Sequence, residues 1–173
     1  MSYPIAIKIL HWLMLPLLVG MYLLGDWMVG LDYYSPWYQQ APHLHKVIGL
    51  VVVVMMLLRL WTRLRSELPA PVATHKRRWQ RTAAKSLQWL FYLVVLGLGV
   101  SGYLISSAEG QGIDLIFGLT LPALMSLGEP QAEWAGFIHE VLAKVFILSL
   151  LLHVLAALKH HFMDRDETLK RML

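Results

Sequence analysis

The sequence predicts an all-α membrane protein: a four-transmembrane-helix bundle with both chain ends in the cytoplasm. Three observations lead to this prediction: the excess of apolar residues, their grouping into four blocks, and the one-sided placement of the basic residues. Of the 173 residues, 57% are hydrophobic and 15% are charged, whereas a soluble domain has about half and about a quarter. A chain of this length is enough for one domain, which we expect to comprise residues 1–173.

Four apolar blocks are each long enough to cross a hydrocarbon core of about 30 Å. Because lipid offers no hydrogen-bond partners to the backbone, blocks of this kind are expected to be helices. A Leu-Pro-Ala-Pro segment at residues 68–71 breaks the chain after the second block and predicts a connection. The predicted spans are residues 5–29, 44–64, 87–107 and 137–162.

The basic residues predict the orientation of the bundle. Every lysine and arginine except Lys46 and Lys144 falls near the first span's start, from the end of the second span to the start of the third, or at and after the end of the fourth. With an even number of spans these regions share one side of the membrane, which the positive-inside rule assigns to the cytoplasm. The net charge of +4 is therefore an orientation signal. Nucleic acid is not an expected partner, because no folded basic face is evident.

The chain contains no cysteine. This excludes an iron–sulfur cluster held by the chain, a thiolate-ligated haem and covalent c-type attachment of haem. The first span contains a histidine and a proline and is long enough to cross the membrane, so we do not expect it to be a cleaved signal peptide.

Four of the eight histidines lie within the predicted spans and pair by depth. The topology places His45 and His139 near the outer face, and His11 and His153 toward the cytoplasm. His139 and His153 are fourteen residues apart, so on a helix they differ by only about 40° in direction and by about 21 Å in height. One face of the fourth helix thus presents two imidazoles, each opposite a histidine of another helix.

Two opposed imidazoles at each level favour haem iron, whose two axial positions they can fill. A zinc site would usually need three or four ligands, and Glu140, next to His139, points about 100° away. The alternative is that the histidines are packed polar residues that join helices by hydrogen bonds. Four ionisable residues that pair in a membrane are costly, which favours a function. We expect two haem b groups, one on each pair.

Arg59 follows His45 by fourteen residues, so it should face the bundle near the inner pair. A cation there would pair with a haem propionate; the alternative is an arginine at a helix end that reaches for the interface. Gly25 and Gly49 lie near the level of His45. They either leave room for a flat macrocycle or belong to ordinary helix contacts.

Short segments around these histidines are also distinctive. They are His11-Trp12, Leu44-His45-Lys46 with Gly49, the outer run at residues 117–122, His139-Glu140, and the segment from His153 to His160-His161-Phe162. Together with the four spans, they resemble the bacterial di-haem cytochrome b561 family over nearly the whole chain. The resemblance implies that His11 and His153 ligate the inner haem iron and that His45 and His139 ligate the outer one. Some relatives carry a histidine where this chain has Gln88, so we expect no ligand from the third helix.

The resemblance also implies a function in the bacterial inner membrane. The expected protein passes electrons from an outer-face donor, which is superoxide for some family members, to ubiquinone on the cytoplasmic side. His160 matches a histidine associated with the quinone site, where an imidazole can relay a proton; otherwise it is an interfacial polar residue. An alternative is an electron-transfer or anchoring subunit that serves a soluble or periplasmic redox protein. A proton or metal-ion transporter fits poorly, since the four short spans contain no inverted repeat.

Overall fold

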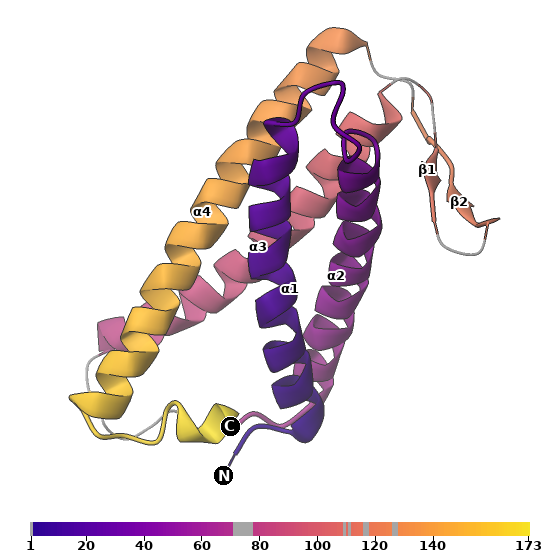
Figure 1. The fold of residues 1–173 in the computed structure, drawn as a ribbon. Helices are drawn as coiled ribbons and strands as arrows, with labels where there is room; N and C mark the ends of the chain where they lie inside the picture. The colour runs from indigo at the N-terminus through magenta and orange to yellow at the C-terminus, as the bar shows by residue number, and fades with distance from the viewer. Residues whose placement is uncertain (1, 71–77, 109, 111, 116–117, 126–127) are drawn as a thin grey trace.

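Four long helices form a membrane-spanning bundle in the computed structural model (Figure 1). The structure describes all residues except 1, 71–77, 109, 111, 116–117 and 126–127. The helices are α1 (Ile5–Val29), α2 (Gln40–Arg65), α3 (Arg78–Ser107) and α4 (Glu129–Phe162). Each is long and apolar enough to cross a membrane.

The observed helices extend beyond the predicted spans at three of the four starts. Helix α1 has the predicted bounds, whereas α2, α3 and α4 begin earlier, at Gln40, Arg78 and Glu129. Hydropathy detects only the part of a helix that lies in lipid, while backbone hydrogen bonding continues into the polar interface. The predicted basic residues at 76–77 and the start of the outer run at 117 lie outside the described residues.

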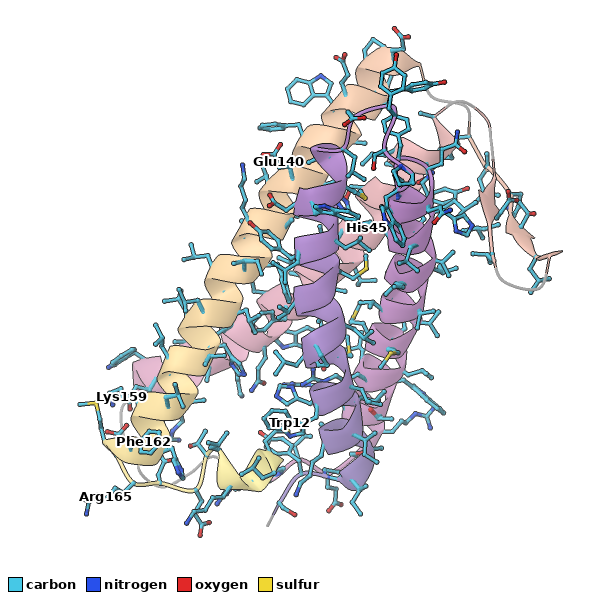
Figure 2. The ribbon with its side chains drawn as sticks, viewed as in Figure 1. Trp12, His45, Glu140, Lys159, Phe162 and Arg165 are labelled. Carbon is cyan, nitrogen blue, oxygen red and sulfur yellow. The ribbon has the colours of Figure 1, made fainter. Side chains whose placement is uncertain are left out.

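Both described chain ends lie at the same end of the bundle, which we call the inner end (Figure 1). A short 3-10 helix, η2 (Lys170–Met172), folds back there against the start of α1. The Trp12 indole N–H donates to Met172 O at 2.9 Å, and the Tyr3 backbone N–H donates to Arg171 O at 3.1 Å (Figure 2). These bonds hold residues 170–173 beneath the helix that carries His11.

The opposite, outer end carries a small hairpin between α3 and α4. Strands β1 (Ile113–Asp114) and β2 (Thr120–Leu121) pair antiparallel. The Tyr103 hydroxyl donates to Pro122 O and accepts from the Leu124 backbone N–H, at 2.8 and 2.7 Å. These bonds fasten the connection to the end of α3.

The buried core lies along the bundle between the two levels of histidines. All four helices contribute to it: Met14, Val52, Met56, Tyr92, Val94, Val95 and Phe146. Most other large apolar side chains are exposed on the outside of the bundle. This distribution is that of a protein surrounded by lipid, where exposed apolar side chains carry no penalty.

Candidate functional site

The inner histidine pair joins the first helix to the fourth. His11 on α1 and His153 on α4 have ring centres 6.2 Å apart, with ring planes at 78°. Phe91 of α3 packs its ring edge-on against His153, with centres 5.6 Å apart. Both imidazoles are partly buried inside the bundle. The fourteen-residue spacing on α4 thus delivers His153 to the level of His11.

The outer histidine pair joins the second helix to the fourth. His45 on α2, labelled in Figure 2, and His139 on α4 also have ring centres 6.2 Å apart, with planes at 66°. A Cβ atom at Gly25 of α1 would lie 3.1 Å from His45 Cε1, and one at Gly102 of α3 would lie 3.3 Å from His139 Cε1. Both distances are tight, so the two glycines seat the imidazoles. Gly49, by contrast, lies next to Met21.

The spacing within each pair fits a metal ion held between two imidazoles. Metal–imidazole bonds of about 2 Å on opposite sides of one ion put the ring centres roughly 6 Å apart. The buried Nδ1 of His45 has no hydrogen-bond partner among the described residues. Paired imidazoles without a third ligand suit the two axial positions of haem iron. Glu140 does not contribute, because its exposed carboxylate pairs with Lys144.

Comparison with known proteins identifies the family of the chain. The family model of prokaryotic cytochrome b561 matches residues 2–173. The chain belongs to the prokaryotic cytochrome b561 family. It is therefore a multi-pass bacterial membrane protein of electron transfer, from a family of haem b-binding oxidoreductases.

Individual relatives span most of this cytochrome b561 chain. Cytochrome b561 homolog 2 of Escherichia coli is 39% identical over 171 residues, which cover 99% of this chain and 90% of the relative. The probable superoxide oxidase CybB of Yersinia pestis is 29% identical over 140 residues, or 81% of this chain and 77% of the relative. Cytochrome b561 homolog 1 of Escherichia coli is 27% identical over 168 residues, covering 95% and 92%.

Arg59 of this cytochrome b561 lies at the inner pair, where its spacing from His45 placed it. One guanidinium nitrogen, Nη2, is 3.0 Å from His11 Nδ1. A guanidinium only donates hydrogen bonds, so Nδ1 must accept, and the neutral His11 ring then carries its proton on Nε2. Iron binding through Nε2 would require Arg59 to turn away from Nδ1. The buried Nε of Arg59 has no hydrogen-bond partner among the described residues, so it suits a further acceptor.

His160 lies in the last helical turn of α4, directly before a chain reversal that the sequence did not predict. Its Nδ1 is 3.0 Å from one carboxylate oxygen of Asp164 and 3.0 Å from one of Asp166. The Asp166 carboxylate is buried and also accepts from the Thr168 backbone N–H at 2.8 Å. Lys159 pairs with Asp164 at 2.6 Å, close to the end of α4 (Figure 2). The contacts with the two carboxylates thus fix the orientation of the His160 ring.

Gln88 joins two helices. The Arg63 guanidinium donates to Gln88 Oε1 at 2.7 Å and lies over the rings of Trp89 and Tyr92, 5.9 and 5.8 Å from their centres. These contacts fasten α2 to α3. They give Gln88 a structural role, which the family resemblance alone did not assign.

Ser101 of α3 is a site residue that sequence reasoning missed. Its Oγ lies 3.0 Å from His139 Nδ1, and its side chain is almost completely buried. The sequence did contain a feature that could have identified it: a hydroxyl side chain within the glycine-containing stretch at residues 97–102 of an apolar span. Glycines there allow α3 to approach α4 closely, and a polar group in such a place needs a partner.

Proposed function

We propose that this cytochrome b561 is a di-haem, quinone-linked oxidoreductase that passes electrons from an outer-face donor to ubiquinone at the inner face. The single observation that carries the proposal is that two histidine pairs lie at different depths of the bundle. Each has ring centres 6.2 Å apart, and each takes one imidazole from α4. Haem, when bound, supplies reversible one-electron chemistry. Two such positions at different depths make a relay through one domain, residues 1–173.

The chain's own residues would hold the two haem b groups in distinct surroundings. His11 and His153 would be the axial ligands of the inner haem iron, and His45 and His139 those of the outer one. Arg59, half-buried next to His11 and with no hydrogen-bond partner for its Nε among the described residues, would give a charge-assisted hydrogen bond to an inner haem propionate. The apolar core between the pairs excludes water from the path between them.

The inner end has the side chain that quinone reduction requires. Reducing a quinone takes up protons as well as electrons, and an imidazole can relay protons near neutral pH. His160 follows His153 by seven residues, or about 10 Å along α4. Its contacts with Asp164 and Asp166 hold the ring in place at the membrane boundary. The inner end would face the cytoplasm of a bacterial inner membrane, as the basic residues indicate.

Superoxide is the outer-face donor that we propose. One relative, 29% identical, is named a probable superoxide oxidase. Lys46, next to His45, places a positive charge at the outer end, which would attract a small anion. The outer end also carries acidic residues, including Asp26 in the last turn of α1 and Asp32 just after it, which oppose that attraction.

The test is a rapid-mixing measurement on the purified protein. We expect about two haems per chain by pyridine haemochrome, and fast haem reduction by superoxide followed by quinol formation from a soluble ubiquinone. One haem per chain would contradict the paired assignment. Two haems without superoxide-driven quinone reduction would favour the alternative, an electron-transfer or anchoring subunit for another redox protein.

A further inference from the structure

We propose that Ser101 is a positioning residue for the outer haem: its hydroxyl fixes the tautomer and orientation of His139. The proposal rests on the proposed outer haem and concerns α3, the helix that supplies none of the proposed ligands. Ser101 is 4% exposed, so its hydroxyl exchanges little with solvent and must be satisfied within the bundle.

The hydrogen bonds around Ser101 define where the protons lie. Its Oγ is 2.7 Å from Gly97 O, 3.2 Å from Leu98 O and 3.0 Å from His139 Nδ1. Backbone carbonyls only accept, so the hydroxyl proton points to them, with Gly97 O the nearer. The lone pairs of Oγ are then left for the imidazole, whose ring N–H donates to Ser101 Oγ and also hydrogen-bonds the Leu98 backbone carbonyl. A neutral imidazole has one N–H, so Nε2 keeps a lone pair for iron.

The neighbouring glycine completes the seat for His139. A Cβ atom at Gly102 would lie 3.3 Å from Cε1 and 3.5 Å from Nδ1 of the same ring. Successive residues of α3 thus give the ring a hydrogen-bond acceptor and a surface on which to rest. Rotation of the ring about its bond to Cβ would break the contact with Ser101 Oγ.

Two other proposed ligands lack this arrangement. His45 Nδ1 is buried without a hydrogen-bond partner among the described residues, and His11 Nδ1 faces Arg59, which only donates. An acceptor at Nδ1 makes a metal-bound imidazole more basic and fixes its orientation. A more basic ligand stabilises ferric iron relative to ferrous iron. The Ser101 hydroxyl therefore lowers the reduction potential of the outer haem, which favours electron transfer inward.

Ser107 offers a matched control for a test of Ser101. It is buried on the same helix, and its Oγ donates to Tyr103 O at 2.9 Å, the same bond to the residue four positions earlier. The described hydrogen bonds of its hydroxyl, to Tyr103 O and Leu104 O, involve no histidine. Ser101→Ala and Ser107→Ala therefore remove the same local bond, and Ser101→Ala alone also removes the contact with an imidazole.

The experiment is low-temperature electron paramagnetic resonance of the oxidised holoprotein, together with haem transfer to apomyoglobin. The low-spin signal missing from His45→Ala identifies the outer haem. In Ser101→Ala we expect that signal to shift and the outer haem to leave about tenfold faster. The inner signal should stay unchanged, and Ser107→Ala should match the wild type for both haems.

The outcomes separate this proposal from the proposed function. An outer signal that is the same in Ser101→Ala and Ser107→Ala would overturn it, as would equal shifts of both haems. If Ser101→Ala loses the outer haem entirely, the near-isosteric Ser101→Cys decides: a shifted signal supports hydrogen bonding, and a wild-type signal refutes it. Failure of superoxide-driven quinone reduction would leave these spectra unaffected, whereas a wild type with one haem would contradict the di-haem assignment itself.

Discussion

The inner and outer histidine pairs have the same ring separation but different neighbours. Both place ring centres 6.2 Å apart. The inner pair has a cation next to it, Arg59, and the outer pair has a hydroxyl, Ser101. The packing of the helices thus gives both pairs the same ring separation. The polar side chain next to each pair, Arg59 or Ser101, makes the surroundings of the two pairs different. A two-site relay needs this difference, because electrons move in a preferred direction only between unequal sites.

Of the substitutions that test this difference between the two pairs, replacing a histidine should have the largest effect. His11→Ala and His153→Ala should each lose the inner haem, and His45→Ala and His139→Ala the outer one, because one axial ligand does not keep the original coordination. Visible spectra and haem counts of the four variants measure this. If His11→Ala and His139→Ala lost the same haem and kept the other, the assignment of pairs would be wrong.

Replacing His160 tests whether the inner end is the one that meets quinone. His160→Ala should slow ubiquinone reduction by at least about tenfold, the low side of what proton transfer by a side chain contributes. Both haems should remain bound with normal spectra. His43→Ala, at the outer end, is the control and should have the smaller effect. Equal turnover of wild type and His160→Ala at saturating donor would remove His160 from the reaction.

A methyl group at Gly25 tests whether the His45 ring needs the space that this glycine leaves. In Gly25→Ala the new Cβ would lie 3.1 Å from His45 Cε1, so the ring must shift and outer haem affinity should fall roughly tenfold. Gly20→Ala is the control on the same helix, since nothing lies within 4 Å of its Cβ position. Haem transfer rates report the difference. An unchanged outer haem in Gly25→Ala would show that the glycine is not needed.

Removing the inner cation should have the smallest effect of the four. Arg59→Gln should lower the potential of the inner haem without removing the haem, because a positive charge next to the site favours the ferrous state. The outer haem should not change. Arg63→Gln removes a cation at the same end that contacts Gln88 instead of His11. A redox titration in which both variants behave alike would argue against a specific role for Arg59.

The sequence predicted the features that depend on one helix at a time. Helical periodicity aligned His139 with His153, and topology alone assigned each its partner. The position of Arg59 followed in the same way. Ser101 was missed because its contact with His139 depends on how α3 is rotated against α4, which no single-helix pattern contains.

The surroundings of His160 were also beyond the sequence patterns. Asp164 and Asp166 reach the same imidazole nitrogen because the chain turns sharply after α4. Arg165, between them, has a φ of 51°, a left-handed conformation that residues other than glycine rarely adopt. Turn propensities give no reason to expect that conformation at an arginine, so the convergence of the carboxylates appears only in the folded chain.

Helix α4 contributes one imidazole to each pair, and this has a consequence for biosynthesis. The ribosome delivers α1, α2 and α3 to the membrane before His139 and His153 exist in the chain. A nascent protein at that stage holds one proposed ligand for each iron and cannot complete either coordination. If the proposed ligands are correct, insertion of the fourth helix would complete both haem sites at the same time, so haem would bind only after all four helices are in the membrane.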